Sequence, residues 1–228
     1  MNLNANRALH YAALAMITAL VGCQTTAPTR SAAEVDVNRA QTTLENFRND
    51  PQMSALQQQL KDAKAVIIAP SVTRAAFVVG GSGGQAIVLA REGTSTEWSG
   101  PAFYKLGAGS LGLQIGVDVS EIVMVVMSDK GLNALLSPKF TLGGDASVVA
   151  GPVGAAASRA VGADIVTFAR SKGAYAGVSL AGAALRPDTA ANEAYYGKSA
   201  SPVDILVRRN VSNEASASLR QSLERMSG

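Results

Sequence analysis

The chain is poor in the residues on which much protein chemistry depends. Its 228 residues include one cysteine, Cys23, and one histidine, His10. A single cysteine excludes an intramolecular disulfide framework, and a single histidine excludes the usual zinc clusters and the Ser-His and Cys-His pairs of hydrolases. The acidic residues stand singly, and no pair of them has the setting of a general acid and base. We therefore expect no enzymatic activity, no metal and no cofactor.

Aromatic and charged residues are also scarce. Aromatic residues make up 5% of the chain and charged residues 16%, whereas 47% of the residues are hydrophobic and 22 are glycine. The apolar content is sufficient for one sizeable core, and the glycines favour close backbone contacts between strands over a long helical bundle. The net charge is +3 and Lys and Arg form no dense run, so we expect no binding to nucleic acid.

The N-terminal segment has the pattern of an export signal. Arg7 precedes an apolar stretch from Tyr11 to Val21, which is too short to span a bilayer as a stable helix. The stretch ends in Leu20-Val21-Gly22-Cys23, which resembles a bacterial lipobox, in which the cysteine thiol receives a diacylglyceryl group before cleavage. We expect residues 1–22 to be a signal peptide and Cys23 to be acylated.

The residues after the signal are predicted to connect a lipid anchor to a folded domain. Residues 23–33 contain the acylated cysteine and a segment rich in Thr, Ala and Pro, which is typical of a flexible tether. Gln24 stands where an aspartate would resemble the inner-membrane retention signal of lipoproteins. We therefore expect anchoring in a bacterial outer membrane, on its periplasmic side or at the cell surface.

Residues 34–228 are predicted to form one α+β domain. Apolar residues recur at helical spacing over 33–47, 51–64 and 212–226, and shorter helices are predicted over 129–136 and 188–196. Because short sequential strands prefer neighbouring pairs, we expect a curved antiparallel sheet or barrel-like sandwich with flanking N- and C-terminal helices. The predicted strands are 65–69, 75–79, 85–91, 102–106, 111–117, 122–127, 139–142, 146–150, 165–170 and 174–180.

Two glycine-rich segments match phosphate-binding patterns in part. Residues 107–112 fit Gly-x-Gly-x-x-Gly, but strands are predicted around them, so no helix N-terminus is available for a pyrophosphate. Residues 80–84 are followed by Gln85-Ala86 in place of the Gly-Lys-Ser/Thr of a P-loop. We interpret the first segment as a strand bend and the second as a flexible hairpin loop.

The remaining polar signal is a set of cations near glycine-rich turns. They are either solvated surface charges or a basic patch for anionic lipid headgroups, to which each near-surface cation contributes about 1 kcal/mol. Arg170 and Lys172 flank a predicted turn at Gly173, where their side chains would reach a bilayer. The other candidates for headgroup binding are Lys105, Lys130 and Lys139.

Several blocks of sequence occur in a defined order between residues 44 and 206. They are Asp50-Pro51, residues 63–70 (AKAVIIAP), Val79-Gly80-Gly81, residues 98–103 (WSGPAF), residues 112–116 (GLQIG), residues 151–154 (GPVG), residues 171–182 (SKGAYAGVSLAG), Asn192 and residues 195–197 (YYG). With these blocks the chain resembles the SYLF lipid-binding domain family.

The resemblance implies a phospholipid-binding domain that has no catalytic residues. Eukaryotic members bind phosphoinositides, and some of them also engage actin. For this chain we expect an outer-membrane-anchored lipoprotein that binds the headgroups of anionic phospholipids, phosphoinositides or other anionic lipids. We do not expect actin binding by a periplasmic protein. The alternative is a structural envelope protein that contacts other proteins through its glycine-rich surface.

Overall fold

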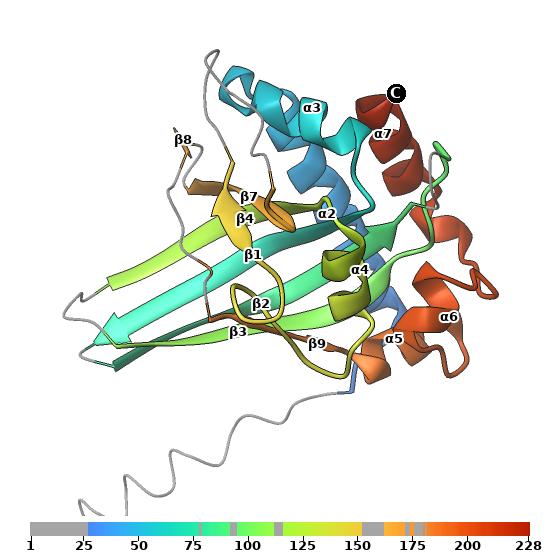
Figure 1. Cartoon of the computed structure of the whole chain (residues 1–228). Coiled ribbons are helices and arrows are strands. Elements are labelled where there is room, and N and C mark those ends of the chain that lie inside the picture. Colours follow the sequence, from blue (N-terminus) through green and yellow to red (C-terminus); the bar gives the residue numbers. More distant parts are fainter. Residues whose placement is uncertain are drawn as a thin grey trace, which may run out of the picture.

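A curved sheet of nine strands, with helices on both of its faces, forms the framework of the protein (Figure 1). The structure is a computed structural model of the chain. It describes residues 27–77, 79–91, 95–111, 116–151, 162–171, 174–175, 180 and 182–228. The predicted fold class, a curved and largely antiparallel sheet with flanking terminal helices, is confirmed.

Helices lie at both ends of the described chain, as predicted, whereas residues 65–77 form one strand where strands 65–69 and 75–79 were predicted, and the last strand was not predicted. The helices are α2 (Arg30–Arg48), η1 (Pro51–Met53), α3 (Ser54–Lys61), α4 (Asp129–Leu135), α5 (Thr189–Tyr196), α6 (Pro202–Leu206), η2 (Glu214–Ser216) and α7 (Ala217–Ser227). The strands are β1 (Ala65–Phe77), β2 (Val79–Ala90), β3 (Ala102–Leu111), β4 (Gly116–Val126), β5 (Phe140–Thr141), β6 (Val148–Ala150), β7 (Ile165–Ser171), β8 (Ala174–Tyr175) and β9 (Ala184–Pro187).

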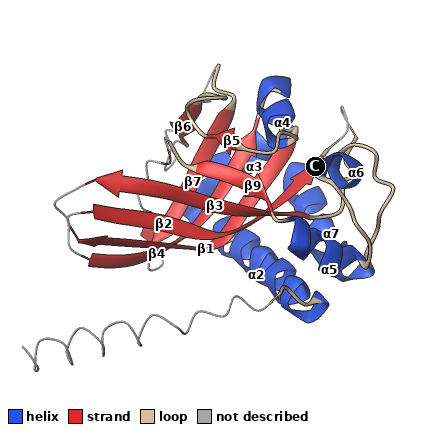
Figure 2. Cartoon of the chain, turned by 90° about the horizontal axis from the view of Figure 1, so that it is seen from below, coloured by secondary structure: helices blue, strands red, loops and turns tan. Residues whose placement is uncertain are grey.

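Four long strands make up the centre of the sheet. The spatial order is β5-β9-β3-β2-β1-β4-β7-β6, and β8 pairs with β7. Every pair of strands is antiparallel except β6 with β7. In Figures 1 and 2, β1 to β4 extend well beyond the helices on one side, so each of these strands has a covered half and a projecting half.

The projecting half contains two glycine-rich segments that were predicted to interrupt the strands. Residues 80–84, predicted to be a hairpin loop, lie inside β2 and pair on both sides, for example Gly83 with Thr73 and with Gly107. That prediction is wrong, because pairing with two neighbouring strands outweighs the low intrinsic strand propensity of glycine. Residues 107–111 were interpreted as a strand bend, but they continue β3 as one strand with residues 102–106.

An irregularity in β1 separates the two halves. Pro70 was expected to end a strand, but β1 runs through it, and its pairing shifts by one residue between Ala69 and Val72 relative to β4. The pairing with β2 shifts in the same stretch, so β1 holds one residue more than its neighbours there. The close approach of Ser71 requires glycine at position 84, where an added Cβ would lie 2.3 Å from the Ser71 carbonyl oxygen.

The covered half has a core on each face. Alternate residues of β1 to β4, among them Ile68, Ile87 and Phe103, pack against α2, α3, α5 and α7 on one face, which we call the helix face. The intervening residues, among them Ile67 and Tyr104, pack on the opposite face with α4, β5, β9 and α6. Figure 2 shows α2 and α4 on opposite sides of the sheet.

Residues of the blocks that resemble SYLF domains hold α5 against β3. The side chain of Asn192 accepts a hydrogen bond from the Phe103 backbone N–H (2.9 Å) and donates to the Phe103 carbonyl (3.3 Å). The Tyr196 hydroxyl donates to the Pro101 carbonyl at 2.9 Å, and the absence of a side chain at Gly100 leaves room for that hydroxyl. These residues therefore have structural roles.

Replacing Gly84 with alanine tests whether the extra residue of β1 shapes this region. The added Cβ meets backbone atoms of Ser71 and Val72, so we expect Gly84→Ala to lower the free energy of unfolding by about 1–3 kcal/mol. Gly109→Ala is the matched control, because a Cβ there meets no atom within 4 Å, and a change within about 0.5 kcal/mol is expected. Urea denaturation of both variants measures the difference, and equal effects would contradict this account of β1.

Candidate functional site

The projecting half of the sheet has an open surface on the helix face. Successive steps of two residues from Phe103 and Ile87, which face the helices, lead along β3 and β2 to four glycines. The same steps from Val123 lead along β4 to two valines. We call this surface the platform; its residues are Thr73, Gly81, Gly83, Gly107, Gly109, Val117 and Val119.

The platform combines bare backbone with exposed apolar side chains. Val117 is 71% exposed and Val119 is 47% exposed, so both present apolar surface to solvent on the same face of β4. A Cβ atom added to Gly107 would lie 4.0 Å from the Ser82 carbonyl oxygen, and one added to Gly109 would meet no described atom within 4 Å. Packing within the described chain therefore does not require glycine at these positions. The platform thus exposes backbone on its central strands β2 and β3.

Two cations stand side by side at the inner border of the platform. Lys105 of β3 pairs directly with Arg186 of β9, which places both side chains on the helix face. Lys105 is 66% exposed and forms an ion pair with the buried Asp188 at 3.1 Å. Arg186 is exposed and forms no ion pair with any residue that the structure describes. Like charges directly opposite each other destabilise a sheet, so this pair is a candidate for anion binding.

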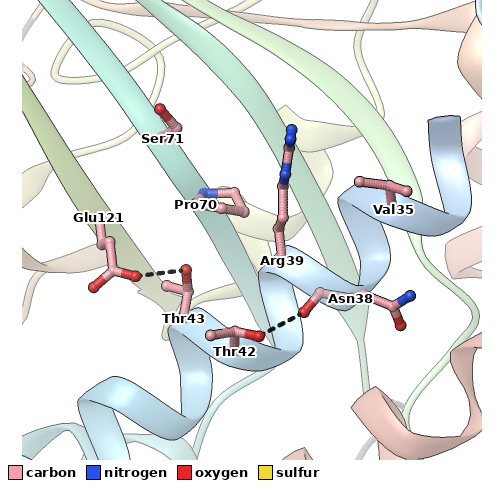
Figure 3. Close-up of a pocket in the computed structure, with 8 residues that line it drawn as sticks. All are labelled: Val35, Asn38, Arg39, Thr42, Thr43, Pro70, Ser71 and Glu121. Carbon is pink, nitrogen blue, oxygen red and sulfur yellow. Dashed lines mark hydrogen bonds between the residues drawn. The ribbon is translucent and has the colours of Figure 1, made fainter.

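A groove lies where α2 crosses the irregular part of β1 (Figure 3). Its main cavity has a volume of about 560 Å³, and a smaller cavity of about 170 Å³ adjoins it and shares Arg39, Pro70 and Ser71. The main cavity is lined from α2, β1 and β4 by Val35, Asn38, Arg39, Thr42, Thr43, Pro70, Ser71 and Glu121. The extra residue of β1 forms the floor of the groove.

One end of the groove is acidic. Glu121 accepts hydrogen bonds from the Thr43 hydroxyl (3.1 Å) and the Asn46 amide (2.9 Å). Its other oxygen pairs with Arg170 at 3.1 Å, and Arg170 also pairs with Asp50 at 3.1 Å. One guanidinium therefore faces two carboxylates, and the cluster carries one net negative charge.

The other end of the groove holds an arginine, Arg39, beside an aspartate, Asp36. The Arg39 side chain is 66% exposed and extends over the sheet (Figure 3). Its one ion pair within the described part of the chain is with Asp36, at 3.4 Å. Burial raises the pKa of Asp36, and the Arg39 charge opposes that shift. The smaller cavity extends from Arg39 to Gln85, which pairs with Lys105 across β2 and β3. The cations of the platform border therefore continue into the groove.

The predicted headgroup-binding residues lie at separate places. Lys105 stands at the platform, whereas Lys130 lies on α4 and pairs with Asp164 at 3.6 Å, on the opposite side of the sheet. Lys139 is exposed just before β5, on that same side. Because Arg170 is only 14% exposed and pairs with two carboxylates, its charge is used to hold the acidic cluster. Lys172 and Cys23 lie outside the described residues, and their predicted roles stay predictions.

Arg39 and Arg186 complete the cationic region. Arg186 belongs to the set of cations near glycine-rich turns, but neither residue was among the predicted headgroup-binding residues. Arg186 lies in β9, a strand that was not predicted from the sequence, and only the pairing of β3 with β9 places it beside Lys105. Arg39 lies on the polar side of α2, and no local sequence pattern identifies it as a binding residue, because its setting depends on the irregularity of β1.

Within the described residues, no group of three or more His, Cys, Asp or Glu side chains is placed to hold a metal ion. No helix of the described chain is long and apolar enough to cross a membrane.

Comparison with known proteins identifies the family to which the chain belongs. The family model described as "Ysc84: Las17-binding protein actin regulator" matches residues 107–226, more than half of the chain. The match confirms the resemblance to the SYLF family. The description names binding and regulation and no reaction, and the family is of a non-enzymatic type.

Relatives in yeast and mammals match about two thirds of this chain. The Saccharomyces cerevisiae protein YSC84 is 32% identical over 157 residues, which are 66% of this chain and 33% of that protein. The human SH3 domain-containing YSC84-like protein 1 is 32% identical over 164 residues, which are 70% of this chain and 47% of that protein. LAS seventeen-binding protein 3 of Saccharomyces cerevisiae is 32% identical over 157 residues, 66% of this chain and 34% of that protein.

The chain thus spans between a third and a half of the length of these relatives. Their names correct one expectation from the sequence. Actin-related partners were not expected, whereas the family description names an actin regulator and a relative is named for binding LAS seventeen. The chain is a member of the Ysc84 family, related to actin-regulating Las17-binding proteins.

Proposed function

We propose that this protein is a membrane-associated binding module whose platform docks on bilayers that contain anionic phospholipids. The observation that carries the proposal is the presence of exposed apolar and cationic side chains on one face of the sheet. Val117 and Val119 are exposed on the platform, and Lys105 and Arg186 stand at its border. Apolar side chains favour the boundary between headgroups and acyl chains, and nearby cations attract anionic headgroups.

The bare backbone of the platform supports the same function. A surface with four glycines lets strands β2 and β3 approach a bilayer closely, because no side chain stands between the backbone and the lipid. Phosphoinositides and other anionic phospholipids share the negative charge that the border cations would attract.

A covalent anchor would keep the module at a membrane. We propose that the Cys23 thiol receives a diacylglyceryl group before residues 1–22 are removed, and that the protein is attached to a bacterial outer membrane, as the sequence Leu20-Val21-Gly22-Cys23 indicates. Two or three acyl chains provide stable attachment without a membrane-spanning helix. The platform would then strengthen or orient contact with a bilayer.

The second candidate function is the binding of a protein partner of the actin-regulatory kind. It is favoured by the family description and by the names of the relatives. The same platform offers exposed valines to a protein partner, and in that setting the chain would act through protein contacts. Binding to protein-free vesicles separates the two functions, because vesicles contain no protein partner.

Removing the two border cations tests the platform. We expect the double variant Lys105→Gln/Arg186→Gln to bind phosphatidylglycerol-containing vesicles at least tenfold more weakly, since each near-surface cation contributes about 1 kcal/mol. Glutamine is chosen because Asp188 is buried beside Lys105 and a new carboxylate there would destabilise the fold. Vesicle co-sedimentation at low salt measures the affinity.

Lys130→Gln/Lys139→Gln is the matched control, since it removes the same charge from the opposite side of the sheet. The control is expected to bind as the parent protein does. Equal losses in both double variants would mean that only net charge matters and would contradict a binding role for the platform.

Replacing Cys23 with alanine tests the anchor. The thiol is the single cysteine of the chain, so Cys23→Ala is expected to abolish incorporation of labelled fatty acid and to release the protein from the membrane fraction or leave it unprocessed. Metabolic labelling followed by fractionation measures both effects. Undiminished labelling of the variant would exclude acylation at Cys23.

A further inference from the structure

We propose that the groove between α2 and β1 binds a zwitterionic group that carries a primary ammonium and a phosphate, as in the headgroup of an aminophospholipid or a soluble amine phosphate. The inference deepens the proposed function, because it assigns a second, headgroup-selective site next to the platform. It is carried by opposite charges at the two ends of one groove, with Glu121 at one end and Arg39 towards the other.

The acidic end has one acceptor position left for an ammonium. A carboxylate offers about four lone-pair sites. Glu121 uses two of them for Thr43 and Asn46 on one oxygen, and one for Arg170 on the other. Since Arg170 is shared with Asp50, the cluster keeps one net negative charge. A primary ammonium supplies both the N–H donor and the charge that this end requires.

The Arg39 end of the groove has donors left for a phosphate. A guanidinium carries five N–H donors, and Arg39 uses one of them for Asp36 within the described chain. The others are free to bind a phosphate in the two-pronged geometry that arginine favours. The amide of Asn38 and the hydroxyl of Ser71 line the same cavity and add further donors, whereas the Thr42 hydroxyl donates to the Asn38 carbonyl at 3.1 Å.

The size of the groove fits an extended polar ligand. A volume of about 560 Å³ exceeds that of a single phosphate or ammonium ion and lies in the range of small-molecule sites. A simple anion would satisfy Arg39 and leave the acidic end without a ligand, and a simple cation would do the reverse. A zwitterion satisfies both ends at once.

Titration of the full chain with small probes tests the site. With Cys23→Ser to keep the protein unlipidated, O-phosphoethanolamine is expected to produce saturable NMR shifts in the amides of α2 and of Ala69, Ser71 and Val72. Phosphocholine is expected to bind at least tenfold more weakly, because its trimethylated nitrogen has no N–H to donate to Glu121. Inorganic phosphate and ethanolamine, each supplying one charge, are also expected to bind at least tenfold more weakly.

Arg39→Gln is the test variant, and Arg48→Gln is its matched control. Both arginines are exposed on α2, but only Arg39 lines the groove. We expect Arg39→Gln to weaken binding of O-phosphoethanolamine at least tenfold and Arg48→Gln to leave it unchanged. Absence of saturable shifts, equal affinity for phosphocholine, or full binding by Arg39→Gln would overturn the proposal.

Vesicles identify the source of the ligand. At constant phosphatidylglycerol, replacing phosphatidylcholine with phosphatidylethanolamine strengthens binding if the site takes a lipid headgroup, and Arg39→Gln removes that increase. No increase, together with binding of the soluble probe, supports the site and assigns it to soluble amine phosphates. Binding to phosphatidylglycerol vesicles reports on the platform through the Lys105→Gln/Arg186→Gln variant, whereas titration with O-phosphoethanolamine involves no vesicle, so failure of the groove and failure of the platform are distinguishable.

Discussion

One extra residue in β1, between Ala69 and Val72, determines how the sheet and α2 fit together. On one side of it the strands are covered on the helix face by α2, α3, α5 and α7, and on the other side the same strands project into solvent. The irregularity also leaves the space that becomes the groove under α2. Glycine at position 84 is what allows the β1 backbone to approach this closely.

The electrostatics of the site follow from this arrangement. The acidic cluster around Arg170 joins Asp50, at the start of η1, to Glu121 on β4, so it fastens the C-terminal end of α2 to the sheet. The middle of α2 brings Arg39 over the same strands, towards Gln85 and Lys105. The groove therefore lies between the ion-pair cluster around Arg170 and the cations at the border of the platform. This juxtaposition underlies both proposals.

Local patterns in the sequence predicted the fold well. The stripe of Val37, Ala40, Leu44 and Phe47 is buried in α2 as its helical spacing indicates, and the change to short alternating runs marks the start of β1. The glycine-rich part of β2 was misjudged, because glycine has low strand propensity and only pairing with β1 and β3 makes it a strand.

The site was less predictable, because it depends on contacts between distant segments. Arg170 looked like a free cation near a turn, but its carboxylate partners come from positions 50 and 121. Lys105 was identified as a candidate, yet its neighbour Arg186 is set by the register of β3 with β9, which no local pattern reveals. Lys130 and Lys139 were grouped with Lys105 by charge alone, and the topology places them on the other side of the sheet.

The position of Val117 relative to the bilayer tests the central claim most directly. In a Cys23→Ser chain, an environment-sensitive dye on Val117→Cys would report on the platform, and the same dye on Val207→Cys, which is also exposed but follows α6, would serve as the reference. With phosphatidylglycerol vesicles, the account predicts a blue-shifted emission at position 117 and no shift at position 207. A shift at position 207 alone, or bound protein with no shift at position 117, would contradict docking through the platform.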